Sequence, residues 1–564
     1  MCINISLDCS TSYIKKAQYT FEVLFDTLGF PYTFVDSNER NKIMGGILIS
    51  YGGADDSKGL SQNKIGRILI SESWTEDIDQ IQVGFLSTPE GEKLPVLSKK
   101  GDKVSQRISA PTDDLVLIQM DLIFSSFFFL SRWEEMVSKT TDRHGRFITR
   151  ESISHAYQFS QRAILNEYLK FLLEIISQIA RAKKIPLLRK CFWPNGQKLA
   201  VCLTHDVDII EKWYIYSLIR CLELIKTGQL SSFLTTFWSL IKGIMSAKNP
   251  ALAFEQITSA EDKFFFRSSF YFMMGKPKLK DLFSSDITYD LSKPNTLEKA
   301  REVLKEGFEI GLHASYNTFL DPQSLLKEKE ELERLIDSPI LGLRQHFLRF
   351  KIPESWIDQN NCGFLYDTTL GFADRSGYRA SFTFPFNTYD LKNDQKMSLI
   401  ELPLVIMDRT YSKYLSFSPD EIMEDVINIF RDLEDSGGLA TILWHTHMVD
   451  ELGFSGYPQL YEKILDFMYR KGYFVASAKE IADWWRRRTN FELKNHFTEN
   501  KKTSWEFVGF DPMDKISFEL IAVSAENLRV EGCDYQVTRE GQNTLAKLEG
   551  IEKGRKVTIA IEIT

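Results

Sequence analysis

The sequence predicts an α/β protein whose central part is a distorted (β/α) barrel of about seven strands. Between residues 198 and 476, short apolar runs of strand length alternate with segments of helical periodicity, which is typical of parallel strands joined by crossover helices. Six of these runs end in polar residues that can take part in chemistry, and catalytic groups of barrels usually lie at the carboxyl ends of the strands. We expect an α/β amino-terminal domain and a small all-β carboxyl-terminal module on either side.

Residues 1–189 are predicted to form the amino-terminal α/β domain. Apolar runs at 46–51 and 67–71 alternate with polar loops, and 121–135 and 164–182 have helical patterns. The run Lys183-Lys-Ile-Pro186 then predicts a boundary, since proline cannot continue a helix. The sequence predicts no role for this domain.

Residues 190–491 are predicted to form the barrel, with a helical insertion at about 212–257. Capping boxes at Ser418-Pro-Asp-Glu421 and Ser477-Ala-Lys-Glu480 mark the starts of two helices, and Gly307 marks the end of another. The segment 213–248 is rich in Ile, Leu, Phe and Trp with interspersed basic residues. It is interpreted as a pair of amphipathic helices packed on the core, with an interfacial helix in peripheral contact with a membrane as the alternative.

Residues 504–564 alternate polar and apolar residues between turns, which predicts a small antiparallel β module. The mostly polar run 494–503 is predicted to be the linker that precedes it.

Composition narrows the classes of function. The net charge of -8 argues against nucleic acid as a partner, and seven cysteines without paired short spacing favour a reducing compartment over a disulfide framework. The first residues show no basic region followed by an apolar core, so we expect a cytoplasmic protein, peripheral to the inner face of the membrane if 213–248 is interfacial. No oligomeric state is predicted.

The polar strand ends form the main clue to function. Five of the eight histidines fall in the barrel segment. The strand-like runs end at Asp206 and Asp208, at His313, at Arg344 and His346, at Asp367, at Asp408 and at His445.

These side chains predict a hydrolytic metal site, which needs three protein ligands and one open position. Asp208 and His313 are the best two ligands, and the second carboxylate, Asp206, is free to act as a base. The third ligand is either Asn317, one helical turn after His313, or His346. His346 is slightly preferred, because an asparagine oxygen is a poor ligand for zinc.

The motifs resemble those of the polysaccharide deacetylase (NodB-homology) family. Thr204-His-Asp-Val-Asp208 is similar to its acidic motif, His313-Ala-Ser-Tyr-Asn317 matches its two-histidine motif in part, and Arg344-Gln-His346 and Leu443-Trp-His445 are similar to its arginine and late histidine motifs. The resemblance covers roughly residues 195–490 and indicates a divergent branch with an extra amino-terminal domain.

The resemblance implies a metal-dependent hydrolase that removes the N-acetyl group from an amino sugar of a polysaccharide or its precursor. It implies that Asp206 is the general base, that Arg344 holds Asp206 and that His445 protonates the leaving amine. The implied cofactor is a divalent cation, zinc first and cobalt or nickel as alternatives, held by Asp208, His313 and His346 or Asn317. The implied partner is a carbohydrate.

Four further residues are candidates for substrate binding. Arg375 and Arg379 could bind a phosphate or carboxylate, or could form ion pairs that anchor a loop. Trp444 is a candidate sugar platform, although a core position is the commoner role of such a residue, and His447 is the fallback for His445. Asp367 and Asp408 are expected to cap turns or to pair with arginines.

Two other functions stay open at this stage. One is a barrel amide hydrolase that acts on a small cyclic amide or ureide. The other is a carbohydrate-binding or scaffold protein built on a catalytically decayed deacetylase.

Overall fold

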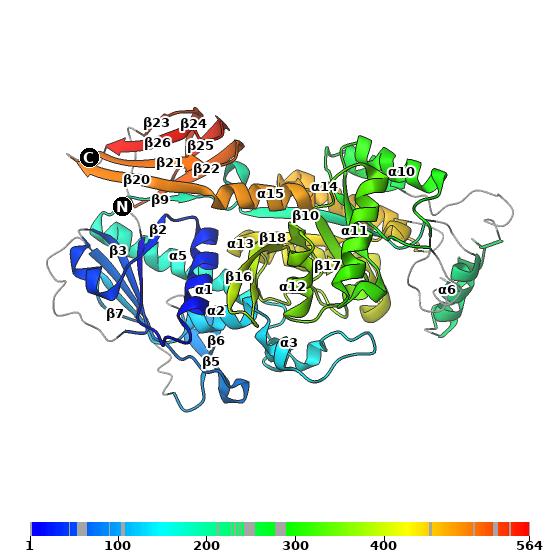
Figure 1. The fold of residues 1–564 in the computed structure, drawn as a ribbon, viewed down its shortest axis with the longest axis horizontal. Helices are drawn as coiled ribbons and strands as arrows, with labels where there is room; N and C mark the ends of the chain where they lie inside the picture. Colours follow the sequence, from blue (N-terminus) through cyan, green and yellow to red (C-terminus); the bar gives the residue numbers. More distant parts are fainter. Residues whose placement is uncertain are drawn as a thin grey trace.

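The structure, a computed structural model, describes residues 3–562 apart from 44, 54–64, 89–90, 103–107, 211–213, 227, 231–232, 235, 239, 242–253, 277–288, 450–453, 500–501, 523–527 and 541–542. It has a mixed α/β part at the amino terminus, a curled sheet surrounded by helices in the centre and two antiparallel sheets at the carboxyl terminus (Figure 1). No helix in these ranges combines the length and the apolarity that a membrane span requires.

The amino-terminal part is built on a six-stranded sheet that is parallel except at one edge. Helices α1 (Ile14–Leu28) and α5 (Ile164–Lys183) pack against it, followed in space by α2 (Leu122–Leu130) and the short helices α3 (Trp133–Val137) and α4 (Ile153–Ala156). The strand order is β2 (Tyr32–Phe34), β1 (Ile3–Leu7), β3 (Gly46–Tyr51), β4 (Ile65–Ile70), β8 (Leu115–Ile118) and β7 (Ile108–Thr112), and β5 (Ile81–Ser87) with β6 (Lys93–Lys99) forms a separate hairpin.

The central part is a ten-stranded sheet that is parallel except for one edge strand. Its order is β15 (Phe386–Asp390), β16 (Gln395–Glu401), β14 (Tyr366–Asp367), β13 (Gly342–Gln345), β12 (Glu309–Ala314), β11 (Ser269–Phe272), β10 (Leu199–Val207), β18 (Gly438–Leu443) and β17 (Leu404–Met407), with β19 (Phe474–Ala476) beside β10. Among the residues that the structure describes, no pairing joins β15 to β17, so the sheet is a curled half-barrel, and the closed barrel of about seven strands stays a prediction.

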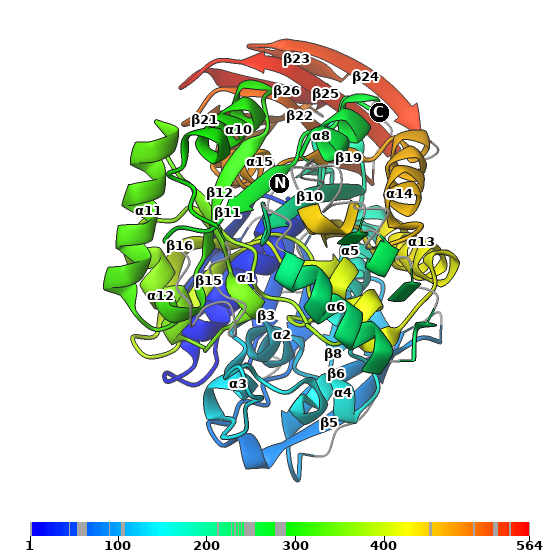
Figure 2. The same cartoon turned by 90° about the vertical axis from the view of Figure 1, so that its right-hand side faces the viewer.

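Helices cover the outside of this curled sheet. Figure 2 shows α10, α11 and α12 on one side and α13 and α14 on the other. The helices are α6 (Tyr214–Lys226), α8 (Phe254–Asp262), α10 (Pro294–Lys305), α11 (Pro322–Ile336), α12 (Glu354–Asn361), α13 (Pro419–Ser436), α14 (Tyr457–Lys471) and α15 (Ala478–Thr489). One hydrophobic core runs through both this part and the amino-terminal part.

Two four-stranded antiparallel sheets form the carboxyl-terminal module, with their own core between them. One consists of β20 (Phe491–Glu499), β21 (Lys502–Gly509), β26 (Lys556–Glu562) and β23 (Arg529–Glu531), and the other of β24 (Asp534–Glu540), β25 (Asn543–Ile551), β22 (Met513–Ile521) and β9 (Leu187–Lys190). Strand β9, which follows α5, therefore lies in the same sheet as strands more than 300 residues later.

The linker predicted at 494–503 is wrong for its described residues, because they belong to the hairpin of β20 and β21. Most side chains of β20 from Glu492 onwards are exposed or half-buried, since this strand is at the edge of its sheet. The residues of β20 are polar because an edge strand is in contact with water. A linker is polar for the same reason, so composition alone does not distinguish the two.

Much of the segment 213–248 lies outside the described residues. Within the described part, α6 carries exposed Leu218, Leu222 and Ile225 at the spacing of one helical face. The membrane contact stays a prediction.

Candidate metal centre

The functional side chains meet because neighbouring parallel strands end at one edge of the curled sheet. Strand β10 ends in Asp206 and Val207, directly before Asp208, and β12 carries His313. Strands β12 and β13 pair in parallel, with His313 opposite Arg344, and β17 and β18 pair in parallel on the other side of β10. Parallel neighbours place their carboxyl ends at the same edge, so residues far apart in the chain converge there.

Asp208, His313 and His346 form the one group of potential metal ligands found in the described part of the chain. One donor atom from each lies within 4.8 Å of the other two. His313 Nε2 is 3.2 Å from Asp208 Oδ1, and His346 Nε2 is 3.9 Å from the same oxygen. Zinc bonds of about 2.0–2.2 Å in a tetrahedron separate ligand atoms by roughly 3.3–3.6 Å, so the donor set fits such an ion.

The histidines are oriented for this role. His313 Nδ1 lies 2.9 Å from the carbonyl oxygen of Arg344, an acceptor for the Nδ1 proton, so Nε2 is the ring nitrogen that faces Asp208 and is left to bind a cation. His346 follows β13 directly and is buried. Asn317, the other candidate for the third ligand, is exposed on the short 3₁₀ helix Tyr316–Thr318.

The electrostatics of the site favour a charged carboxylate. Burial alone would raise the pKa of Asp208, but its hydrogen bond with His313 and the charges of His445 and His346 hold that pKa well below its usual value. Burial lowers the pKa of His313, and Asp206 and Asp208 together outweigh burial and raise it. In the metal-free protein the carboxylates thus attract protons to histidines that a cation would otherwise bind.

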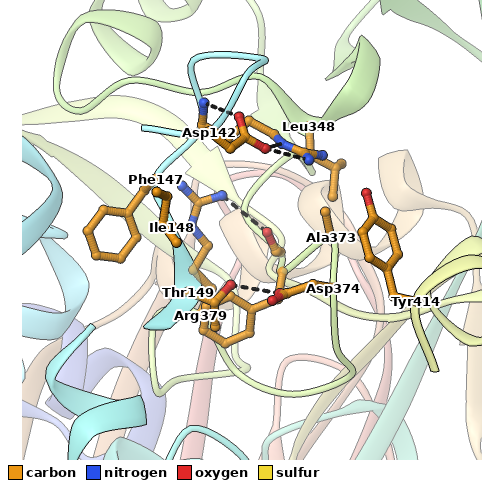
Figure 3. A pocket seen from close by; sticks show the side chains of 12 residues that line it. Asp142, Phe147, Ile148, Thr149, Leu348, Ala373, Asp374, Arg379 and Tyr414 are labelled. Carbon is orange, nitrogen blue, oxygen red and sulfur yellow. Dashed lines mark hydrogen bonds and ion pairs between the residues drawn. The ribbon is translucent and has the colours of Figure 1, made fainter. Parts of the chain in front are cut away.

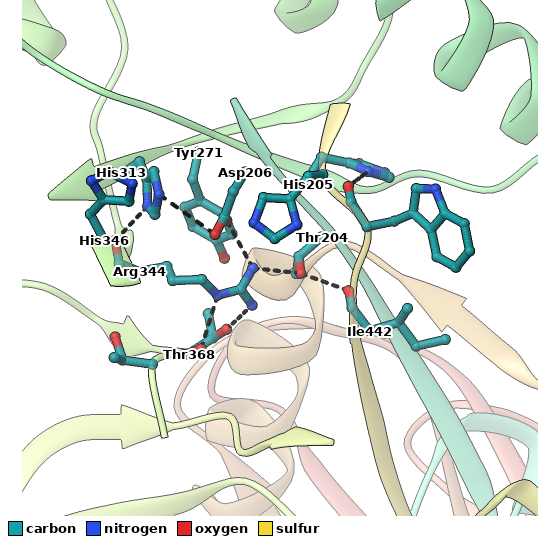
Figure 4. A network of polar contacts seen from close by, with 12 residues as sticks. Thr204, His205, Asp206, Tyr271, His313, Arg344, His346, Thr368 and Ile442 are labelled. Carbon is teal, nitrogen blue, oxygen red and sulfur yellow. Dashed lines mark hydrogen bonds and ion pairs between the residues drawn. The ribbon is translucent and has the colours of Figure 1, made fainter. Parts of the chain in front are cut away.

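The guanidinium of Arg344 holds the carboxylate of Asp206 by a hydrogen bond (Figure 4). The fully buried guanidinium donates from Nη1 to Asp206 Oδ1 at 3.0 Å and to Thr204 Oγ1 at 2.8 Å, and from Nε to the Thr368 carbonyl oxygen at 3.0 Å. The other oxygen of Asp206 faces His313 Nε2 at 3.6 Å. Arg344 therefore fixes one carboxylate oxygen and leaves the other directed towards the ligand cluster.

His445 faces the same cluster from β18 and is paired with Asp408 after β17. Its Nδ1 is 2.6 Å from Asp408 Oδ1, its backbone N–H donates to Asp408 Oδ2 at 2.6 Å, and its Nε2 lies 3.6 Å from Asp208 Oδ2. Burial lowers the pKa of His445, but Asp408 and the aspartates of β10 raise it to about 9. Sequence reasoning expected Asp408 to cap a turn or to pair with arginine and missed this contact, although both residues end neighbouring strands.

The neighbouring histidines His205 and His447 are not among the ligands of this cluster. His205 points away from Asp206, as successive residues of a strand do, and contacts the Trp444 carbonyl oxygen and Glu261. His447 is buried, with its ring centroid 5.4 Å from that of His445.

The candidate substrate residues have structural partners. Trp444 is fully buried and packs on Tyr457 and Tyr461, so its ring offers no surface to a sugar. Arg375 contacts His155 of the amino-terminal part, and Arg379 forms a buried two-bond ion pair with Glu135.

A cavity of about 210 Å³ lies between the amino-terminal part and loops of the central part (Figure 3). Arg379 is among its lining residues, and Leu348, two positions after His346, is another. Its remaining walls come from Asp142, Arg146, Phe147, Ile148, Thr149, Gly371, Phe372, Ala373, Asp374 and Tyr414.

A family of unknown function (DUF7033) matches residues 5–181. No curated protein matches the chain.

Several solved structures are similar to part of the chain. They include a CE4 family pseudoenzyme from Bacillus anthracis, at 12% identity over 52% of this chain and 67% of that one with a TM-score of 0.27, and the peptidoglycan deacetylase PdaC from Bacillus subtilis, at 14% identity over 51% and 91% with a TM-score of 0.26. A putative glycoside hydrolase/deacetylase from Parabacteroides distasonis shares 10% identity over 58% of this chain and 79% of that one, with a TM-score of 0.32. Likeness at this level does not assign an activity.

Proposed function

We propose that the chain is a metal-dependent deacetylase that hydrolyses the N-acetyl group of an amino sugar in a polysaccharide or its precursor. The observation that carries the proposal is the convergence of a ligand cluster, an arginine-held carboxylate and a carboxylate-held histidine at one edge of the central sheet. Each of these three groups alone is common in folded proteins. Together they supply the parts of a metal-assisted amide hydrolysis.

Asp208, His313 and His346 would hold the cation. A bound zinc ion would supply Lewis acidity for the acetyl carbonyl and a water of lowered pKa. Cobalt and nickel are the alternatives to zinc.

Asp206 is proposed as the base that takes a proton from the attacking water. Its Oδ1 is occupied by Arg344 at 3.0 Å, so the lone pairs of Oδ2 are the ones directed at the ligand cluster. Arg344 keeps this carboxylate in place from the buried side, where no solvent competes for it.

His445 is proposed as the acid that protonates the departing amine. Asp408 holds the Nδ1 proton, and Asp408, Asp208 and Asp206 together raise the pKa of the ring to about 9, which favours a proton on Nε2 in the metal-free chain. Nε2 is directed at Asp208, so the acid and the base face the ligand cluster from the neighbouring strands β18 and β10.

Metal content and acetate release test the proposal. After removal of metal by a chelator, we expect the wild-type chain to bind one zinc ion and to release acetate from N-acetylglucosamine oligomers or from peptidoglycan fragments. Asp208→Ala should lose at least about tenfold in zinc affinity and all acetate release, whereas Asp466→Ala, an aspartate on α14 that pairs with Arg470, should change neither.

Two results would contradict the proposal. A wild-type chain that binds no zinc, cobalt or nickel would instead support a scaffold built on this fold. A chain that binds metal but releases acetate from none of these sugars would refute the deacetylase reaction.

A further inference from the structure

The backbone directly after His346 is in a conformation that its residues do not favour. Phe347 has φ 61° and ψ 13°, and Leu348 has φ 52°, so two successive residues with side chains lie in the left-handed region. Residues other than glycine rarely adopt this backbone conformation, and such a turn persists only where surrounding contacts stabilise it. We call residues 346–349 the ligand turn.

A loop of the amino-terminal part, residues 141–147, lies against this turn, and we call it the clamp loop. The loop is closed by an isolated bridge between Thr141 and Phe147. Asp142 Oδ1 accepts from the backbone N–H groups of His144 and Arg146 at 2.8 and 3.0 Å, and its Oδ2 pairs with the Arg146 side chain. The clamp loop is therefore held in shape by contacts of its own.

Three contacts join the clamp loop to the ligand turn. Arg146 Nη1 donates to the carbonyl oxygen of Phe347 at 2.9 Å, and Arg349 Nε donates back to the carbonyl oxygen of His144 at 2.8 Å. The rings of His144 and Phe347 are stacked, with centroids 4.8 Å apart and planes 17° apart. Two hydrogen bonds and one ring stack therefore hold the ligand turn, through the carbonyl group of Phe347, the side chain of Arg349 and the ring of Phe347.

The far side of the ligand turn is held by the central part. The guanidinium of Arg349 lies 3.8 Å from the ring centroid of Tyr316 and 4.2 Å from that of Phe319. Both aromatic residues follow His313 within six positions. The ligand turn thus lies between the clamp loop and the segment that follows His313, the other histidine ligand.

We propose that the amino-terminal part completes the metal centre, with Arg146 and His144 as positioning residues that keep His346 in reach of the ion. The proposal rests on the proposed function, because it assigns a role in metal binding to residues outside the ligand cluster. In the structure, His346 Nε2 is 3.9 Å from Asp208 Oδ1, and Phe347 and Leu348, directly after His346, are in the left-handed conformation. If Arg146 releases the Phe347 carbonyl group, the turn relaxes towards ordinary backbone angles and the imidazole of His346 moves with it.

The proposal gives a function to the clamp loop, which is not part of the strand-end motifs. Arg146 and His144 lie within residues 5–181, the range that matches a family of unknown function. Removing a partner that orients a metal ligand typically weakens metal binding 10- to 100-fold.

Zinc affinity of the 564-residue chain tests whether the clamp loop positions His346 for the ion. The dissociation constant is measured by competition with a chromophoric chelator for the wild type, Arg146→Ala, Arg146→Lys, His144→Ala and Arg150→Ala. We expect zinc binding about 10- to 100-fold weaker in Arg146→Ala, a smaller loss in Arg146→Lys, which keeps a donor, and no change in Arg150→Ala. Arg150 is a matched control because it lies in the same segment with its side chain 73% exposed.

Hydrogen exchange of the metal-free chain gives a readout that does not depend on zinc. We expect the amides of residues 347–349 to exchange faster in Arg146→Ala than in the wild type, with the rest of the central part unchanged. If Arg146→Ala fails to fold, His144→Ala, which removes the ring that stacks on Phe347 and contacts Tyr316 but keeps the Arg146 hydrogen bond, takes its place in both measurements.

The outcomes separate the two proposals. Wild-type zinc affinity and wild-type exchange in Arg146→Ala and His144→Ala would overturn the clamp while leaving the proposed function intact. If the wild type binds no zinc, cobalt or nickel, the proposed function fails, and unchanged exchange at 347–349 in Arg146→Ala would overturn the clamp as well.

Discussion

Asp408 and His445 show how much a single contact changes the chemistry of a residue. An isolated buried histidine would be neutral at pH 7, because burial disfavours the charged ring. The carboxylate of Asp408, 2.6 Å from Nδ1, is the largest influence that reverses this, and with Asp208 and Asp206 it raises the pKa of His445 to about 9. The same contact selects which nitrogen faces the ligand cluster.

We predict that Asp408→Asn moves the alkaline limb of the pH–rate profile to lower pH. An amide carries no charge, so the pKa of His445 falls from about 9 and the ring loses its proton as the pH rises through a lower value. Acetate release measured from pH 6 to 10, together with a histidine titration of the metal-free chain by NMR, checks this.

Asp466→Asn on α14 is the matched control and should leave the profile unchanged. An unchanged alkaline limb in Asp408→Asn would show that His445 is not the acid.

At the scale of elements, the capping boxes predicted from the sequence are confirmed. Ser418 and Glu421 open α13, and Ser477 and Glu480 open α15, with both reciprocal bonds present in each case. These predictions succeed because a cap depends on residues three positions apart. The predicted linker at 494–503 failed because the state of a polar strand depends on pairing with a partner strand.

We predict that Ser477→Ala lowers the free energy of unfolding by about 1 kcal/mol. Ser477 is buried, its Oγ accepts from the backbone N–H of Glu480, and alanine leaves that donor without its acceptor. Urea denaturation measures the change.

Ser477→Thr keeps the acceptor and should remain within about 0.5 kcal/mol of the wild type. Equal losses in both variants would show that packing, and not the cap, stabilises α15.

At the scale of the whole molecule, the three parts are joined by buried polar contacts as well as by a shared core. Arg488 of α15 is fully buried and donates to the carbonyl oxygens of Asp26 and Thr27 at the end of α1 and of Lys190 and Cys191 at the end of β9. Lys190 in turn donates to the Phe491 carbonyl oxygen, where the carboxyl-terminal module begins. A single side chain therefore connects the amino-terminal part, the central part and β9.

We predict that Arg488→Ala lowers the free energy of unfolding by at least about 3 kcal/mol, because it leaves several buried carbonyl groups without donors. Urea and thermal unfolding of the full-length chain measure the loss, and Arg470→Ala, with its side chain 76% exposed, is the control. A loss in Arg488→Ala no larger than in the control would contradict a structural role for this arginine.

Much of the site could be predicted from the strand ends. Asp206, Asp208, His313, His346 and His445 were all recognised as terminal residues of apolar runs, and the structure brings them to one edge. Asp408 also ends an apolar run, but its partner His445 could not be assigned from the sequence. The order of strands in a sheet depends on contacts between distant segments and not on any single segment.

Local patterns therefore specify which segments of this chain are strands and helices, where helices begin, and which ends carry reactive groups, because each of these depends on residues a few positions apart. Contacts between distant segments specify the rest. Arg146 and Phe347 are 201 positions apart, and Arg488 and Asp26 are 462 apart, so nothing near either residue indicates its partner. The role of the amino-terminal part follows only from the folded chain, in which packing brings the clamp loop onto a turn that its own residues would not hold.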